Sequence, residues 1–171
     1  MVRKLDAGDV IGERRIKISS EINSLELHDQ LALLGADLLR VELMDYVRGN
    51  AAPKPQDESK VTYAKKIDKS EALLDWSLDS RAVHDRIRAF VWGPGTHTFF
   101  QGKRLKIHKA RVADGAGRPG EILRADEKGL VVACGRGALE ILSLQPESRT
   151  VMSSADFMKS QTLAAGLVLG S

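Results

Sequence analysis

Positively charged side chains are concentrated in one stretch of the chain, residues 79–112. Its eight basic residues are Arg81, Arg86, Arg88, Lys103, Arg104, Lys106, Lys109 and Arg111. Asp79 and Asp85 are its only acidic residues, so the stretch carries a net charge of +6 while the whole chain carries +3. The rest of the chain is therefore slightly acidic. A local cationic patch of this kind indicates that the binding partner is a polyanion.

Phosphate contact is the chemistry that these side chains support best. The strongest candidates for such contact are Arg86, Arg88, Lys103, Arg104, Lys106 and Lys109. Contacts of this kind position a nucleic acid without reading its sequence, and they weaken steeply with salt. The plainer alternative is a solvated surface, which is where most lysines and arginines lie. Aromatic residues of the same region would either stack on bases or fill the core: Trp76, Phe90, Trp92, Phe99 and Phe100.

A short helix followed by a β-hairpin must position the basic residues. Helical spacing of Val83, Ile87 and Phe90 predicts a helix that starts near Ser77 or Asp79 and ends before the turn at residues 92–95. Two strands, 96–100 and 103–112, should follow, joined at residues 101–102. In the second strand apolar and basic residues alternate, which predicts one buried face and one cationic face. The alternation fails at residues 109–111, where we expect a β-bulge.

Further strands are expected at 121–125, 130–134 and 138–145, with a short helix capped near Ser153. About five short strands with glycine turns and peripheral helices favour a small Greek-key barrel of the OB type. The predicted fold class is therefore α+β, with an OB-like barrel in the C-terminal part.

The first fifty residues have a different organisation. An acidic turn, Leu5–Asp9, precedes strand-like pieces at 10–11 and 16–18. A helix should then run from an N-cap at Asn23 to a stop at Gly49, with leucines at helical spacing. These elements have nowhere to bury their apolar faces, so they are interpreted as the last strand and helix of a larger α/β domain. The proline-containing residues 50–60 indicate an extended linker.

Composition excludes several classes of site. The single cysteine, Cys134, excludes an internal disulfide framework and a cysteine-rich zinc site. The four histidines have no metal-ligand spacing, so no metal is expected. No apolar run approaches the ~20 residues that cross a bilayer. These features predict a cytoplasmic protein without membrane contact.

The order of several short motifs resembles the methionyl-tRNA formyltransferase family. The matching segments are Leu5-Asp6-Ala7-Gly8-Asp9, Pro53-Lys54-Pro55-Gln56, Thr62-Tyr63-Ala64-Lys65-Lys66-Ile67, Leu74-Asp75-Trp76, Ile87-Arg88-Ala89-Phe90, Leu105-Lys106-Ile107, Pro119-Gly120, Leu144-Gln145-Pro146 and Ala155-Asp156-Phe157. The resemblance covers essentially the whole chain. One departure is Val91-Trp92-Gly93-Pro94-Gly95, where the family usually has Pro-Trp-Pro-Gly.

The resemblance implies a function for each part. Residues 1–49 would be the remnant of a Rossmann-type formyltransferase domain, 50–62 a linker, and 63–171 an OB-like tRNA-binding domain. The family transfers a formyl group from formyltetrahydrofolate to the methionine amino group of initiator methionyl-tRNA, without a metal. Its catalytic Asp corresponds to Asp6, whereas the family's Asn-x-His-x-Ser segment and folate loop do not occur here. Because the tetrahedral oxyanion of formyl transfer needs donors such as that Asn and His, the isolated chain is expected to be inactive.

Alternatives remain open at this stage. Asp6 could be an ordinary turn aspartate, since Asp-x-Gly is common in turns. The chain could be a non-catalytic module that binds RNA or a partner polypeptide, from a truncated or split gene. It could also be a fragment of a sugar-nucleotide formyltransferase. The resemblance further implies a monomer, and supply of the catalytic half in trans is one option.

Overall fold

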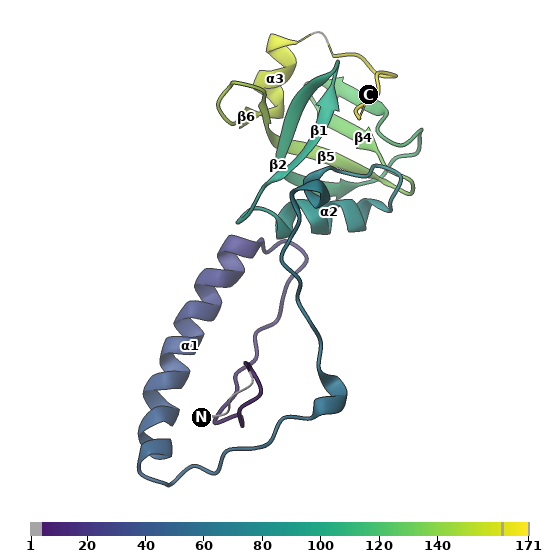
Figure 1. Cartoon of the computed structure of the whole chain (residues 1–171). Coiled ribbons are helices and arrows are strands. Elements are labelled where there is room, and N and C mark those ends of the chain that lie inside the picture. Colours follow the sequence, from purple (N-terminus) through teal and green to yellow (C-terminus); the bar gives the residue numbers. More distant parts are fainter. Residues whose placement is uncertain (1–4, 162, 171) are drawn as a thin grey trace. The chain divides into compact units, whose positions relative to one another are not determined.

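The computed structural model describes residues 5–161 and 163–170 of the chain. These residues form two compact units (Figure 1). Unit 1 comprises the residues up to Ser19 together with Leu25–Lys66, and unit 2 comprises Ser20–Ser24 and the residues from Ile67 onward. Within the described part of the chain, no helix has the combination of length and hydropathy that crossing a bilayer requires.

Unit 1 is built mainly from the helix α1 (Ser24–Val47) and extended segments. The predicted helix is confirmed, but none of its residues is buried. The prediction of a strand at residues 16–18 is wrong, and Val10 forms only an isolated bridge with Lys54, through two hydrogen bonds of 2.8 and 2.9 Å. A strand needs a neighbour to pair with, and the described part of unit 1 contains no sheet. A 3-10 turn, η1 (Glu58–Lys60), follows the bridge.

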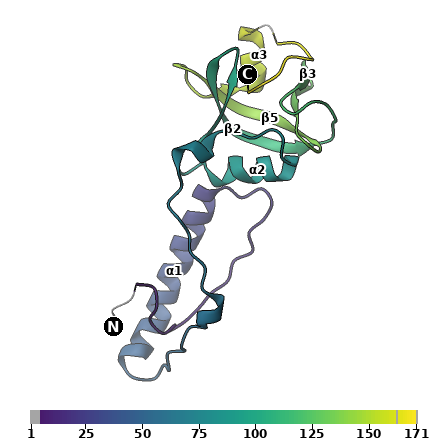
Figure 2. The same ribbon diagram turned by 45° about the vertical axis from the view of Figure 1, so that its right-hand side comes forward.

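Unit 2 contains one curled antiparallel sheet (Figures 1 and 2). Its strands are β1 (Thr96–Phe100), β2 (Lys103–Ala113), β3 (Ile122–Asp126), β4 (Gly129–Ala133), β5 (Ala138–Pro146) and β6 (Met152–Ser153). The order is β1-β2-β5-β4-β3, and β6 pairs with β5. The predicted hairpin is confirmed: Gln101 and Gly102 both have positive φ values, 51° and 72°, as a tight two-residue hairpin turn requires. The predicted bulge is also confirmed, because the β2–β5 register shifts on both sides of Lys109.

Two helices lie at opposite ends of the curled sheet (Figures 1 and 2). α2 (Ser80–Ala89) packs on β2 and β5 and buries Val83 and Ile87, as its spacing predicts. α3 (Ser154–Ser160) buries Phe157 against β3, β4 and β5, and Ser153 is its N-cap. A 3-10 turn, η2 (Lys69–Ala72), precedes the sheet. The core is a single cluster of aliphatic and aromatic side chains from the sheet and both helices. Helices that pack on one antiparallel sheet confirm the α+β class.

The C-terminal residues close a gap between the two outer strands of the sheet. The amide of Ile122, at the start of β3, donates to the carbonyl of Leu167 (2.7 Å), and Gly166 donates back to Ile122 (2.9 Å). A few residues later the amide of Gly170 donates to the carbonyl of Phe99 in β1 (2.7 Å). Residues 166–170 thus form hydrogen bonds with both β1 and β3, the outermost strands of the sheet.

Candidate nucleic-acid interface

The outward face of β1 and β2 carries a strip of polar, basic and aromatic side chains. In the register of the hairpin, Lys106 lies opposite His97, and Arg104 lies opposite Phe99. Leu105 and Ile107, which alternate with Arg104 and Lys106 along β2, are buried in the core. The alternation of side chains along the hairpin therefore gives it one face in the core and one face toward solvent. We call His97, Phe99, Arg104 and Lys106 the outward strip.

Four of the six predicted phosphate-binding residues lie on β2 with their charges available. Lys103, Arg104 and Lys109 are exposed, and Lys106 is half-buried. Among the described residues, no carboxylate oxygen lies within 4 Å of their amine or guanidinium groups. Arg111, further along β2, differs because it forms a 2.7 Å ion pair with Glu140. Residues 103–109 are therefore the part of β2 whose positive charges have no carboxylate partner in the described structure.

The other two predicted residues, Arg86 and Arg88, lie on α2 and have structural partners. Arg86 donates to the backbone carbonyl of Glu71 at 3.0 Å. Arg88 donates to Asp85 at 2.7 Å and to the carbonyl of Ile22 at 2.8 Å, and only 22% of its side chain is exposed. These contacts hold neighbouring segments of unit 2 together, which the residue types alone did not reveal.

His97 adds an uncharged ring to the outward strip. Partial burial lowers its pKa, and the positive charges of Arg104 and Lys106 lower it further. The ring packs edge-on against Phe99, with centroids 5.8 Å apart. At neutral pH the strip therefore combines a neutral imidazole, an aromatic ring and two fixed cations. Sequence reasoning missed His97, although the strand alternation places it on the same face as Phe99.

The aromatic residues divide between the core and the surface. Trp76, Phe90 and Phe100 are buried. The indole nitrogen of Trp76 donates to the hydroxyl of Thr98 at 3.0 Å. Trp92 is 57% exposed, and Phe99 is half-buried. Only these last two of the five candidate rings are accessible for stacking.

A small cleft of about 110 Å³ joins the strip to the turn after α2. Lys106 and His108 form one wall, and Gly93, Pro94 and Gly95 form the other. The side chain of His108 lies 3.2 Å from that of Gln145 on β5. A glycine-rich wall exposes backbone groups, so a phosphate or sugar can approach closely beside the Lys106 amine.

The predicted catalytic residue, Asp6, lies in a turn of unit 1. Its backbone φ is 55°, a left-handed conformation that aspartate tolerates better than most residues. The amide nitrogen of Gln56 donates to the carbonyls of Asp6 (2.8 Å) and Gly8 (2.7 Å). The turn is therefore held by a residue from the segment predicted to be a linker. Sequence reasoning singled out both motifs but not the contact between them.

The described residues contain neither a metal-binding cluster nor a reactive cysteine. No cluster of three or more His, Cys, Asp or Glu side chains is placed there to hold a metal ion. Burial raises the pKa of Cys134 to about 11, with a smaller contribution from Asp79, so the thiol is protonated at neutral pH. A protonated, buried thiol is a poor nucleophile.

Comparison with known proteins identifies relatives for the whole chain. A family model described as "Formyl transferase, C-terminal domain" matches residues 66–162. The methionyl-tRNA formyltransferase of Bdellovibrio bacteriovorus is 56% identical over 175 residues, which cover 99% of this chain and 55% of that protein. The chain thus spans about half the length of the curated relatives that it matches.

Two solved structures share the fold. A variant of HypX from Aquifex aeolicus aligns with a TM-score of 0.68 at 21% identity, covering 92% of this chain and 29% of HypX. An N-formyltransferase from Helicobacter canadensis, in complex with folinic acid and dTDP-3-aminofucose, aligns with a TM-score of 0.63 at 15% identity. That alignment covers 82% of this chain and 52% of the transferase.

Proposed function

The chain belongs to the formyl transferase C-terminal domain family, and on that premise we propose that it is the C-terminal part of a methionyl-tRNA formyltransferase. The observation that carries this proposal is the 56% identity to a methionyl-tRNA formyltransferase over 99% of the chain. Its reaction would be the transfer of a formyl group from formyltetrahydrofolate to the amino group of initiator methionyl-tRNA. The chain would contribute mainly the part that holds the tRNA.

The charge distribution of unit 2 supports the tRNA-binding role. Lys103, Arg104, Lys106 and Lys109 lie along one strand without carboxylate partners in the described structure. Several cations along one strand can contact several phosphates of one RNA backbone, and such contacts supply most of the affinity for nucleic acid. Arg86 and Arg88 would contribute to the positive field from α2 while also holding their backbone partners.

Residues 1–49 would be the end of a Rossmann-type catalytic domain, and residues 63–171 would form an OB-like Greek-key barrel. Closure of the sheet by residues 166–170 supports the barrel. Residues 50–62 would be the linker. Lys54 and Gln56 form hydrogen bonds with the segment 6–10, so the part of the linker up to Gln56 is held against unit 1. Only the residues after Gln56 would then be free to act as a flexible connection.

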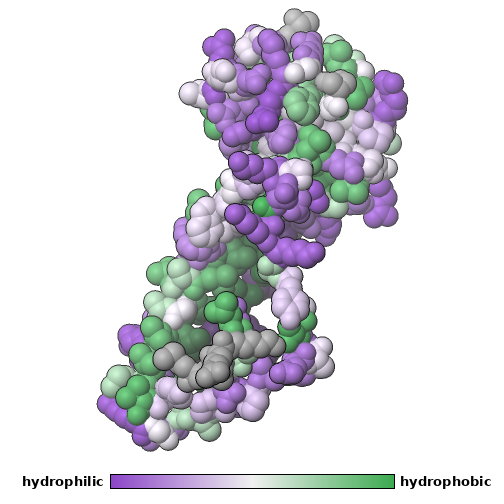
Figure 3. All heavy atoms as spheres, viewed as in Figure 1, coloured by the Kyte–Doolittle hydropathy of each residue, from purple (hydrophilic) through white to green (hydrophobic). Residues whose placement is uncertain are grey.

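The surface of unit 1 supports a catalytic domain with further parts. Hydrophobic residues gather along α1 in the space-filling view (Figure 3). Large apolar side chains on this helix are exposed, including Leu33 (73%) and Leu39 (59%). A cleft of about 320 Å³ lies between α1 and the segment 9–12, and Val10, Ile11 and Leu38 line it. In the proposal, the Asn- and His-bearing half of the enzyme, in the same polypeptide or in trans, covers this surface.

Asp6 would orient the catalytic His and help to manage the proton that leaves the attacking amine. Formyltetrahydrofolate would bind outside this chain's residues, and no metal would take part. The protein would act as a cytoplasmic monomer. A sugar nucleotide is the competing substrate class, since one structural relative was solved with dTDP-3-aminofucose.

Binding measurements separate these substrate classes. The full chain should bind initiator tRNA, and log affinity should fall linearly with log salt. Arg104→Glu combined with Lys106→Glu should weaken binding and reduce the salt slope by about 2, since two phosphate contacts are lost. Lys128→Glu, on the β3–β4 turn, is the matched control and should leave the slope unchanged. Tighter binding of dTDP-3-aminofucose than of tRNA would overturn the proposal.

The catalytic part of the proposal has its own test. Formylation of methionyl-tRNA should be undetectable with the chain alone. It should appear when an Asn-x-His-x-Ser-containing N-terminal half of a relative is added, and Asp6→Asn should abolish it. If the isolated chain turned over at the rate of a full-length enzyme, the catalytic Asn and His would not be needed from a second half, and this part of the proposal would be wrong.

A further inference from the structure

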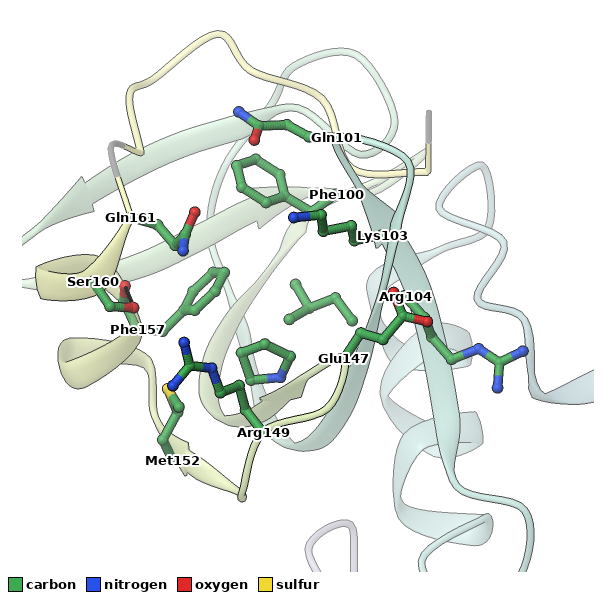
Figure 4. Close-up of a pocket in the computed structure, with 12 residues that line it drawn as sticks. Phe100, Gln101, Lys103, Arg104, Glu147, Arg149, Met152, Phe157, Ser160 and Gln161 are labelled. Carbon is green, nitrogen blue, oxygen red and sulfur yellow. Dashed lines mark hydrogen bonds between the residues drawn. The ribbon is translucent and has the colours of Figure 1, made fainter.

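A cavity of about 300 Å³ lies at one end of the sheet in unit 2, beside the β1–β2 hairpin (Figure 4). Phe100, Leu105 and Phe157 form its floor, and all three are buried in the core. The two phenyl rings meet edge to face, with centroids 6.1 Å apart. Pro146 and Met152 form partly exposed apolar walls. The cavity is therefore rigid and apolar at its base.

Its rim is polar and mainly cationic. Lys103, Arg104 and Arg149 line it, against a single acid, Glu147. Across the part of the chain that the structure describes, none of these three cations has a carboxylate within 4 Å. In Figure 4 the Lys103 amine reaches over the apolar side chains, whereas the Arg104 guanidinium is directed away from them. The rim therefore places positive charge beside an apolar base.

The backbone of the Arg149 turn is fixed by hydrogen bonds. The amide of Arg149 donates to the carbonyl of Pro146 at 3.1 Å, and the side chain of Gln145 donates to the carbonyl of Arg149 at 2.7 Å. Across the turn, the amide of Glu147 donates to the carbonyl of Arg104 at 3.0 Å. The fold thus fixes the backbone from which Arg104 and Arg149 extend to the rim.

The ligand that fits must be small, flat, apolar on its faces and negatively charged at one side. The volume lies at the lower end of the range for small-molecule sites, which suits one heterocyclic base and not a stacked pair. Amide groups of Gln101 and Gln161 stand at the rim and can donate to or accept from the edge of a heterocycle. A nucleotide has all of these properties.

We propose that this cavity holds one unstacked nucleotide of a bound RNA, with its base against the partly exposed side chains of Pro146 and Met152 and its phosphate beside Lys103 and Arg149. The inference rests on the proposed function, because it requires RNA on unit 2. Lys103 and Arg104 belong both to the cavity and to the cationic start of β2. A phosphate backbone that follows β2 therefore arrives at the cavity mouth.

Two RNA hairpins with the same stem test this inference. One carries a single unpaired adenosine and the other is fully paired. Fluorescence anisotropy with the full chain should show about ten-fold tighter binding of the bulged hairpin, since removing part of the apolar surface of one base from water has an effect of this order. Ser160→Trp, at an exposed position on the rim, should fill the cavity and remove the preference while the paired hairpin still binds. Arg149→Glu should also remove the preference.

The controls separate the possible failures. Lys128→Glu should keep the preference for the bulge. Equal binding of both hairpins would overturn the inference and leave the proposed function intact. If neither hairpin nor initiator tRNA binds, the proposed function fails and the inference fails with it. Tighter binding of the acidic aromatic peptide Glu-Glu-Phe-Glu-Glu than of the bulged hairpin, abolished by Ser160→Trp, would overturn the assignment to RNA.

Discussion

The side-chain amide of Gln56 donates a hydrogen bond of 2.8 Å to the backbone carbonyl of Asp6, fifty residues earlier in the chain. The same nitrogen donates to the carbonyl of Gly8 at 2.7 Å. A glutamine NH2 group has two N–H donors, and the left-handed backbone at Asp6 brings two carbonyls within its reach. The shape of the acidic turn therefore depends on a side chain from outside it.

Replacing Gln56 by Glu should loosen the turn, because a carboxylate cannot donate to either carbonyl. The loss of these exposed hydrogen bonds should cost about 1 kcal/mol locally. The amides of Val10 and Lys54, which bond each other's carbonyls, should then exchange with solvent about five-fold faster. Hydrogen exchange followed by NMR measures this change.

Gln30→Glu on α1 makes the same chemical change at an exposed site and should leave both exchange rates unchanged. If Gln56→Glu also left them unchanged, the two hydrogen bonds would not hold the turn. In a formyltransferase assembled from this chain and the N-terminal half of a relative, Gln56→Glu should lower kcat more than it raises KM, since its proposed effect is on the orientation of Asp6.

Arg88 should contribute more to stability than to RNA binding. Arg88→Ala removes the hydrogen bonds to Asp85 and to the carbonyl of Ile22, and hydrogen bonds of charged groups contribute about 1.5–3 kcal/mol. Urea denaturation should show a loss of about 1–2 kcal/mol in the free energy of unfolding of unit 2. Lys109→Ala, at an exposed β2 position, should change it by less than about 0.5 kcal/mol. Equal effects of the two substitutions would contradict the structural role of Arg88.

The pKa of His97 predicts a pH-dependent stability. Since burial and neighbouring cations lower this pKa below the ordinary value of 6.5, the unfolded chain binds a proton that the folded protein does not. The contribution is therefore fully present above pH 6.5 and is lost as the pH falls toward the folded-state pKa. Free energies of unfolding at pH 7.5, 6.5 and 5.5 should decline, and His97→Gln should flatten the decline. If the free energy of unfolding of His97→Gln declined equally with pH, titratable groups other than His97 would cause the decline.

The turn between β4 and β5 should tolerate no side chain at Gly135. Its amide donates to the carbonyls of Trp76 and Leu78, both at 2.8 Å, and a Cβ there would overlap the carbonyl oxygen of Ser77. Gly135→Ala must displace the turn from the start of α2 and should cost about 2–3 kcal/mol in urea denaturation. At Gly93 the nearest atom to an added Cβ is 3.7 Å away, so Gly93→Ala is the matched control and should cost less than about 0.5 kcal/mol.

Acid should weaken the same junction. Arg136 donates to Asp79 at 2.6 Å, and this hydrogen bond, followed by the one from the amide of Arg81, lowers the pKa of Asp79. A carboxyl group with a lowered folded-state pKa stabilises the fold above its unfolded-state value of 3.8 and loses that effect as the pH falls further. Asp79→Asn should remove this part of the acid dependence between about pH 4 and pH 2. Far-UV circular dichroism during acid titration measures it.

Local patterns predicted most elements of unit 2, because each is encoded within a few residues. The spacing of Val83 and Ile87 predicts α2, and the alternation of Leu105 and Ile107 with basic residues predicts the two faces of β2. The contacts that were missed join distant segments. Nothing near Arg88 indicates the carbonyl of Ile22 as its partner, and nothing near Gln56 indicates Asp6. The strand expected at residues 16–18 failed for a related reason: β-propensity produces a strand only where a neighbour is available to pair with it.

The segment 166–170 also limits where a second molecule could pair with the sheet. An outer strand with free backbone groups is a template for strand addition by a second molecule. Here the start of β3 is paired with Gly166 and Leu167, and the outer edge of β1 is occupied by Gly170 and Leu74. The start of β3 and the outer edge of β1 are therefore occupied by segments of the same chain, which leaves less of the sheet open to edge-to-edge aggregation.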